Sequence, residues 1–247
     1  MEGQLHHLAN PHLGRPGFMW CYGHWGPPVL VFPSAAGMAH EWQAHSMIDT
    51  HADLLSAGRL KLYCVESNVA DSWTNKERSL EGKMERHRAY ERFILENVVP
   101  FIYEDCRTEG IPITAVGISV GALLAVNFAL KYPQVFHHAI GFSGRYNAMH
   151  FTHGQSNDDV YFNNPLAYVP GLSGEVLEHV RQNARFTLVC GQGKWEDGNI
   201  EETVMMGRLL RSKDIACETD IWGRDSHHQW PYWKLQSRKY FQQLFGA

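Results

Sequence analysis

A five-residue segment, Gly117-Ile-Ser-Val-Gly121, restricts the possible folds of this chain more than any other. The apolar residues 111–116 before it are typical of a buried strand, and residues 122–132 after it are typical of a helix that stops before Pro133. Such a tight turn brings backbone segments close together, and glycine two positions before and after the serine leaves room for them. The segment therefore predicts a strand–turn–helix unit with Ser119 at its apex.

Short apolar segments alternate with helical segments along the rest of the chain. The further expected strands are residues 17–22, 28–32, 60–65, 136–142, 185–190 and 217–222. The further expected helices are residues 41–57, 86–106, 200–213 and 231–245, and Pro100 is expected to bend the second of them. This order predicts an α/β fold with a mostly parallel sheet of about eight strands and helices on both faces. Residues 143–175 lack a clear periodicity and are expected to form a cap-like insertion within a single domain, residues 1–247.

The composition excludes several classes of protein. The chain has 247 residues, of which 44% are hydrophobic and 19% are charged, so we expect a folded chain with a large core. The net charge is −4 and the basic residues are scattered, so nucleic acid is not expected as a partner. The longest apolar runs, such as residues 28–33, are as short as strands, and no membrane span is predicted.

The cysteines and the first residues indicate a compartment. The five cysteines are odd in number, widely spaced and without a C-x-x-C pair, which favours reduced thiols over disulfides or a zinc site: Cys21, Cys64, Cys106, Cys190 and Cys217. The first ten residues lack the basic start and apolar stretch of a secretory signal. Both observations predict a cytoplasmic protein.

Three segments carry a resemblance to a known family. Residues 117–121 match the G-x-S-x-G nucleophile elbow, in which a serine is exposed at a strand-to-helix turn. Residues 29–37 read Val-Leu-Val-Phe-Pro-Ser-Ala-Ala-Gly, and Trp230-Pro-Tyr-Trp233 stands just after a histidine. With these segments the chain resembles the α/β-hydrolase superfamily over nearly its whole length, and within it the small esterases related to esterase D. The resemblance implies a cofactor-free serine esterase of the α/β-hydrolase fold.

A serine hydroxyl needs a base within hydrogen-bond reach, and the base needs a group that orients it. In this fold the serine is followed along the chain by the acid and then by the histidine. His227 and His228 both follow the last expected strand, and the resemblance aligns His228 with the family's catalytic histidine. Glu196 and Asp197 are both candidates for the acid. The spacing of three residues from Gly193 favours Glu196, whereas aspartate is the commoner acid, so both stay open.

Ester hydrolysis builds negative charge on the carbonyl oxygen, which backbone N–H groups can stabilise. One such donor is expected from Val120, at the start of the helix that follows Ser119, where the helix dipole also favours an anion. The other is expected from the small-residue loop at residues 33–37, with Ala35 as the first choice and Ala36 as the next.

Seven aromatic residues are expected in loops at the carboxyl edge of the sheet, where ligands bind in such folds: Trp73, Tyr146, Phe151, Tyr161, Phe162, Trp195 and Trp230. They predict a fairly closed pocket that suits a small acyl group. No metal site is expected, because the spacings of His40, His45 and His51 do not place them on one helix face.

The sequence therefore predicts that Ser119, His228 and Glu196 or Asp197 hydrolyse a small-molecule carboxylic ester without a cofactor. Two alternatives stay open. The same triad can transfer the acyl group to an alcohol instead of water, and a member of the fold can serve as a non-catalytic binding protein. Pairing of two copies through an exposed edge strand, giving a homo-oligomer, also stays open.

Overall fold

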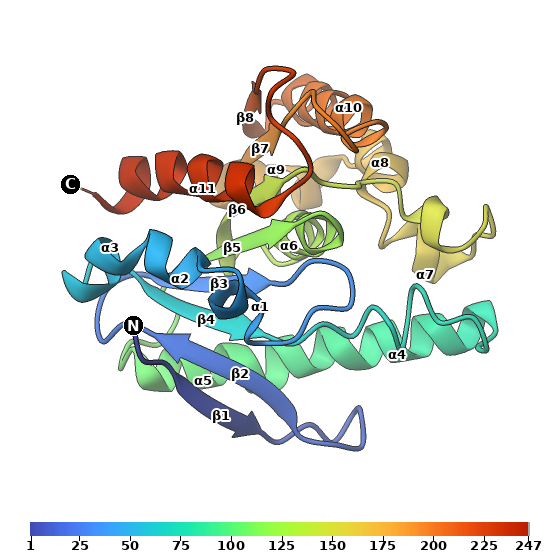
Figure 1. Cartoon of the computed structure of the whole chain (residues 1–247). Helices are drawn as coiled ribbons and strands as arrows, with labels where there is room; N and C mark the ends of the chain where they lie inside the picture. Colours follow the sequence, from blue (N-terminus) through green and yellow to red (C-terminus); the bar gives the residue numbers. More distant parts are fainter. Residues whose placement is uncertain (247) are drawn as a thin grey trace.

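The computed structural model describes residues 1–246, and within them the chain forms an eight-stranded sheet with the order β1-β2-β4-β3-β5-β6-β7-β8 (Figure 1). The strands are β1 (Gln4–Leu8), β2 (Gly17–Tyr22), β3 (Pro28–Phe32), β4 (Lys61–Val65), β5 (Ile113–Ile118), β6 (Phe136–Phe142), β7 (Arg185–Cys190) and β8 (Ala216–Ile221). At one edge, β2 pairs antiparallel with both β1 and β4. The six strands β4, β3, β5, β6, β7 and β8 run parallel to one another. The predicted α/β class is confirmed.

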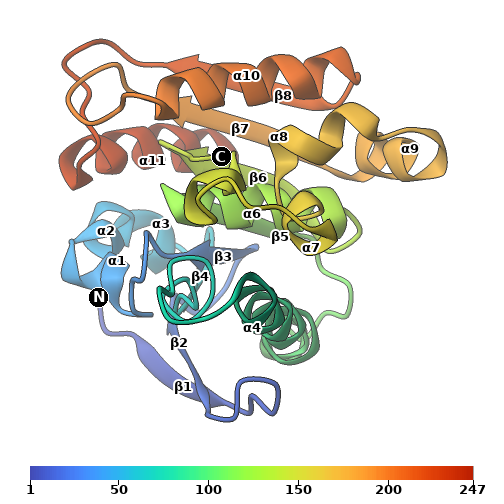
Figure 2. The ribbon, with the colours of Figure 1, turned by 90° about the vertical axis from the view of Figure 1, so that its right-hand side faces the viewer.

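Helices cover both faces of the sheet (Figures 1 and 2). They are α1 (Glu41–Ala44), α2 (Met47–Thr50), α3 (Ala52–Ser56), α4 (Leu80–Phe93), α5 (Val99–Asp105), α6 (Val120–Lys131), α7 (Asp158–Tyr161), α8 (Pro165–Tyr168), α9 (Gly174–Asn183), α10 (Asn199–Ser212) and α11 (Trp230–Phe245). Helices α1–α3 and α11 contribute to one hydrophobic core, while α4–α6, α9 and α10 contribute to the other. Helix α6 is buried along nearly its whole length because it packs in the middle of the second core. None of the helices in the described residues has the length and apolar character needed to cross a membrane.

Several elements differ from the sequence prediction, among them helix α9, which was not expected. Strand β1 was not predicted, because this edge strand is mostly exposed and carries two histidines instead of an apolar run. The helix expected at residues 41–57 is split into α1, α2 and α3, and Ser46 between the first two has a left-handed backbone, with φ of 57°. The helix expected at residues 86–106 contains a π-helical turn, Ile94–Val98, between α4 and α5. Since Pro100 clashes with the carbonyl four residues earlier in a regular helix, a widened turn before it is the expected response.

Residues 143–175 contain short helical turns in place of regular periodicity. They are the 3₁₀ turns Ala148–Phe151 and Val169–Gly171, the helices α7 and α8, and the start of α9. Glu202 of α10 ties this segment to the sheet layer, because its buried carboxylate accepts hydrogen bonds from the N–H groups of Tyr146 (2.7 Å) and Asn147 (2.8 Å). The His150 ring contacts the same carboxylate at 2.6 Å. The segment thus lies against α10, which begins just after the loop that follows β7.

One histidine is fully buried in the core beneath α11. The His51 ring packs against Trp42 and Phe241, and its Nε2 atom lies 3.1 Å from Ser237 Oγ. Burial, together with the smaller effect of the nearby Arg238 charge, lowers the pKa of His51 to about 3. The ring is therefore neutral in the folded protein at mildly acidic pH, where an unfolded histidine takes up a proton.

His51 should make the protein less stable in mild acid. The unfolded state binds a proton on His51 below about pH 6.5, whereas the folded state binds it only near pH 3. The free energy of unfolding therefore falls as the pH falls through this range. The full contribution of one such group is about 1.4 kcal/mol per pH unit. The free energy of unfolding, measured with urea between pH 7.5 and 4.5, should fall as the pH falls. His51→Gln should reduce this dependence on pH by the equivalent of nearly one bound proton. Equal slopes for the two proteins would contradict this assignment.

Candidate active site

Ser119 lies at the turn between β5 and α6 and has a backbone conformation that residues other than glycine rarely adopt. Its φ is 56° and its ψ is −117°. The Ser119 N–H donates to the carbonyl of Phe142 at the end of β6 (2.9 Å), and its own carbonyl accepts from the Ala122 N–H (3.1 Å). The surrounding hydrogen bonds therefore hold Ser119 in a strained backbone conformation. Such strained residues are found most often at functional sites.

The two glycines of the turn are required by close backbone contacts. A Cβ atom on Gly117 would overlap the carbonyl group of Gly121. A Cβ atom on Gly121 would lie 2.5 Å from the carbonyl oxygens of Phe32 and Pro33, where β3 ends. Neither backbone can yield easily, so the predicted reason for the G-x-S-x-G spacing holds in the structure.

The candidate histidine and one of the two candidate acids are in contact. His228 Nδ1 lies 3.1 Å from Glu196 Oε2, and the Glu196 side chain is 1% exposed. Within residues 1–246 the carboxylate of Asp197 makes no contact with His228; the backbone carbonyl of Asp197 accepts from Arg145 (3.1 Å) instead. The geometry thus brings Glu196, and not Asp197, to the imidazole.

Two loops hold this pair in register. The loop after β7 and the loop after β8 are joined by hydrogen bonds from Gly193 N to Ser226 O (2.8 Å) and from His228 N to Lys194 O (3.1 Å). The N–H of Lys194 donates to Nδ1 of His227 (2.8 Å). A Cβ atom on Gly193 would overlap the His227 ring. His227 therefore ties the two loops together.

The carboxylate of Glu196 accepts further hydrogen bonds that the sequence did not reveal. Ser143 Oγ donates to Oε1 (2.6 Å), and Asn199 Nδ2 donates to Oε2 (3.1 Å). Ser143 Oγ in turn accepts from Trp233 Nε1 (2.9 Å), and the Trp233 ring packs edge-on against His228 at 4.9 Å between centroids. Trp233 belongs to the Trp-Pro-x-Trp segment, the one sequence signal for this arrangement; Ser143 and Asn199 carried none.

Glu196 is ionised despite its burial. Burial alone raises its pKa, but the hydrogen bonds from His228, Ser143 and Asn199 outweigh this effect and hold the pKa below its ordinary value. A buried, ionised carboxylate beside Nδ1 fixes the imidazole orientation and stabilises the imidazolium form. The free Nε2 atom is then the one available to act on a proton.

Removing the Ser143 hydroxyl should slow catalysis without weakening substrate binding. Ser143→Ala leaves both Glu196 Oε1 and Trp233 Nε1 without a partner in a buried site. We expect kcat for p-nitrophenyl acetate to fall about tenfold, or about 1.4 kcal/mol, with KM unchanged within twofold. Ser72→Ala is a matched control, because Ser72 is also fully buried and donates one hydrogen bond, to Asn68 O (2.9 Å), away from this site. A loss of kcat in both variants would contradict a specific role for Ser143.

The two predicted oxyanion donors lie on the elements that flank Ser119. Val120 is the first residue of α6, where its N–H has no acceptor within the helix. The Ala35 carbonyl accepts from Ser67 Oγ (2.7 Å), which fixes the loop after β3. Across the described part of the chain, neither the Ala35 nor the Ala36 N–H group has a hydrogen-bond partner. Both remain candidates for the second donor.

Glu41 holds the loop that carries these alanines. Its carboxylate accepts from the Ser34 N–H (2.8 Å) and from Ser34 Oγ (2.6 Å), and the Gly37 N–H donates to Ser34 O (2.8 Å). A side chain on Gly37 would overlap the Glu41 carboxylate. The start of α1 therefore fixes the backbone of residues 34–37.

The prediction of an aromatic pocket is wrong for two of its residues. Trp73 and Tyr146 are fully buried in the core and cannot line an open pocket. The Trp73 indole packs against His87 and Phe151, which periodicity could not show. Trp195 and Phe162 are each 57% exposed, and Trp230 stacks on His45 at 4.1 Å. Within residues 1–246, no group of three or more histidine, cysteine, aspartate or glutamate residues is placed to hold a metal ion.

Comparison with known proteins identifies the family of this chain. Residues 23–239 match the model of the family described as "Putative esterase", so the chain belongs to that family and is a carboxylic ester hydrolase of the α/β-hydrolase fold. No curated protein sequence matches the chain.

Solved structures share the fold at low identity. A ferulic acid esterase is 14% identical with a TM-score of 0.76, over 99% of this chain and 97% of that one. The S-formylglutathione hydrolase from Staphylococcus aureus is 12% identical with a TM-score of 0.70, over 99% and 95%. The corresponding hydrolase from Agrobacterium tumefaciens is 12% identical with a TM-score of 0.72, over 99% and 94%.

Proposed function

We propose that this esterase works through Ser119, His228 and Glu196 and forms an acyl-enzyme intermediate. The observation that carries the proposal is the 3.1 Å contact between His228 Nδ1 and the buried, ionised Glu196, downstream of a strained serine and in the chain order that this fold uses. Asp197 is not proposed for this role, because its carboxylate does not reach the imidazole.

In the first half of the reaction, Ser119 Oγ attacks the ester carbonyl while His228 Nε2 takes its proton. Glu196 stabilises the resulting imidazolium. The N–H groups of Val120 and of Ala35 or Ala36 stabilise the oxyanion, and each such donor typically contributes about 3–4 kcal/mol. The imidazolium then protonates the leaving alcohol, and Ser119 carries the acyl group. In the second half, His228 deprotonates a water molecule, which releases the carboxylic acid.

We propose short acyl chains as substrates, because the large Trp73 and Tyr146 side chains are fully buried in the core instead of bordering a long channel. The five cysteines in the described residues are free, which supports our proposal of a reducing compartment such as the cytoplasm.

Hydrolysis of p-nitrophenyl acetate, butyrate and octanoate tests this function. We expect kcat/KM to be highest for acetate or butyrate and at least tenfold lower for octanoate. Product analysis in the presence of glycerol separates hydrolysis from transfer, because an acyltransferase would yield mostly glyceryl ester in place of free acid. Absence of turnover on all three esters would contradict the proposal and favour a non-catalytic binding role.

A further inference from the structure

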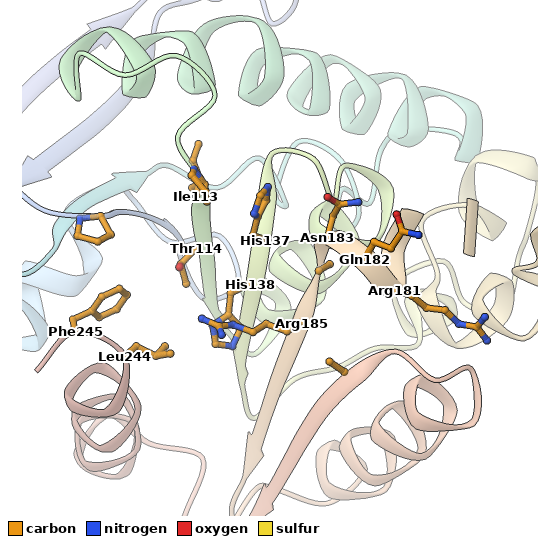
Figure 3. A pocket seen from close by; sticks show the side chains of 14 residues that line it. Ile113, Thr114, His137, His138, Arg181, Gln182, Asn183, Arg185, Leu244 and Phe245 are labelled. Carbon is orange, nitrogen blue, oxygen red and sulfur yellow. The ribbon is translucent and has the colours of Figure 1, made fainter. Parts of the chain in front are cut away.

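A hollow of about 580 Å³ opens at the amino edge of the sheet (Figure 3). Its lining residue Ile113 begins β5, whereas Ser119 follows the last residue of that strand. The hollow lies where β5, β6, β7 and β8 begin and where α11 ends. The six residues of β5 separate this edge from the serine, a distance of roughly 20 Å at about 3.3 Å per residue. The esterase site therefore makes no use of the groups in this hollow.

His138 of β6 lines the hollow and carries an unsatisfied nitrogen. The residue is 5% exposed, and its Nε2 atom lies 2.9 Å from Thr187 Oγ1. Its Nδ1 atom is buried and has no hydrogen-bond partner among the described residues. Burial, together with the smaller effect of the Arg185 charge, lowers the pKa of His138 to about 3, so the ring is neutral at neutral pH. Because the Thr187 hydroxyl can donate to Nε2, the proton can stand on Nδ1, where it lacks an acceptor.

Arg185 of β7 is the direct cross-strand neighbour of His138. Figure 3 shows the two side chains converging between the start of β6 and the end of α11. Arg185 is exposed, and no ion pair or hydrogen bond engages its guanidinium within residues 1–246. Arg181, the other arginine of the hollow, is already paired with Glu178 and Asp214. A free guanidinium offers a planar set of donors that fits a carboxylate through two parallel hydrogen bonds.

The rest of the lining restricts the ligand further. Pro27, Pro112, Ile113, Leu244 and Phe245 supply apolar walls, whereas Thr114, His137, Gln182 and Asn183 supply neutral polar groups. None of the lining residues is acidic. A smaller adjoining hollow of about 240 Å³ shares His138 and Arg185 and contains one carboxylate, Glu218. One free cation beside a neutral histidine balances a monoanion better than a dianion, and the apolar walls favour an organic body over a bare inorganic ion.

We propose that this hollow binds a small monocarboxylate with an apolar body. The carboxylate pairs with the exposed Arg185 guanidinium, next to the buried His138 ring. The apolar body lies against Leu244 and Phe245 at the end of α11. Such a ligand supplies the counter-ion that Arg185 lacks. The site would bind the chemical class that ester hydrolysis releases, but at a place separate from Ser119.

Phenylacetate is a suitable probe, with calorimetric titration as the first measurement. We expect Arg185→Gln to raise the dissociation constant at least tenfold, while Arg92→Gln, which changes an exposed arginine of α4 outside the hollow, changes it less than twofold. Benzyl alcohol and inorganic phosphate should each bind at least tenfold more weakly than phenylacetate. Equal binding of phenylacetate to wild type and Arg185→Gln, or tighter binding of phosphate, would overturn the proposal.

Two further readouts separate this site from the esterase site. In ¹⁵N-histidine-labelled protein, phenylacetate should shift the Nδ1 resonance of His138, and an unchanged His138 resonance at saturation would overturn the proposal even if binding occurred elsewhere. Arg185→Gln should retain p-nitrophenyl acetate hydrolysis within twofold, because Arg185 contacts none of the proposed triad residues. The result for this hollow therefore stands whether or not the Ser119 mechanism is correct.

Discussion

Replacing Ser119 by alanine should lower kcat/KM for p-nitrophenyl acetate by at least about 10⁴-fold, because the variant has no oxygen that can carry the acyl group. The histidine, the acid and the oxyanion donors remain, so a small residual rate above the uncatalysed reaction is expected. The measurement is steady-state hydrolysis under conditions where wild type shows full turnover.

The loss must come from chemistry and not from unfolding. Alanine at position 119 removes no hydrogen bond that holds the turn, because the bonds with Phe142 and Ala122 are made by the backbone. Circular dichroism and the unfolding midpoint should therefore match wild type. Ser212→Ala, at the exposed end of α10, should keep full activity. Residual activity above about 10% in folded Ser119→Ala would exclude Ser119 as the nucleophile.

Replacing Glu196 by glutamine should lower kcat about 10³–10⁴-fold while leaving substrate binding nearly unchanged. The side chain keeps its shape, but an amide NH₂ facing His228 Nδ1 favours the tautomer with the proton on Nε2. That tautomer cannot accept the proton of Ser119. In the wild type, Ser143 and Asn199 donate hydrogen bonds to the ionised carboxylate of Glu196. In the variant, both donors would face a neutral amide instead.

The matched change at the neighbouring residue distinguishes the two acids. Asp197→Asn should retain kcat within threefold, because the structure uses the backbone carbonyl of Asp197 and not its carboxylate to hold Arg145. A large loss in Asp197→Asn with an active Glu196→Gln would reverse the assignment of the acid.

The strand–turn–helix unit could be predicted from sequence because its determinants are local. Gly117 and Gly121 are required by contacts within a few residues and with the end of β3. Parallel strands such as β3 and β7 are equally local signals, since they are short apolar runs that are mostly buried on both faces. Strand β1 has no such run, and its pairing with β2 is what makes it a strand.

The support around the acid could not be predicted, because it depends on elements far apart in the chain. Ser143 follows β6, Glu196 follows β7, and Trp233 belongs to α11. Only the folded sheet brings them within hydrogen-bond distance. The choice between Glu196 and Asp197 has the same origin. Two adjacent carboxylates are nearly equivalent in a sequence, and loop geometry decides which one reaches His228. Trp73 illustrates the reverse error, since a loop position did not make it exposed.

The most direct test of the mechanism is the site of covalent labelling by a fluorophosphonate, read by peptide mass spectrometry. The proposed triad predicts a single adduct on the peptide that contains Ser119, formed at least about 10³-fold more slowly in His228→Ala and absent in Ser119→Ala. An adduct on another residue, or an unlabelled Ser119 in protein that still hydrolyses p-nitrophenyl acetate, would contradict it.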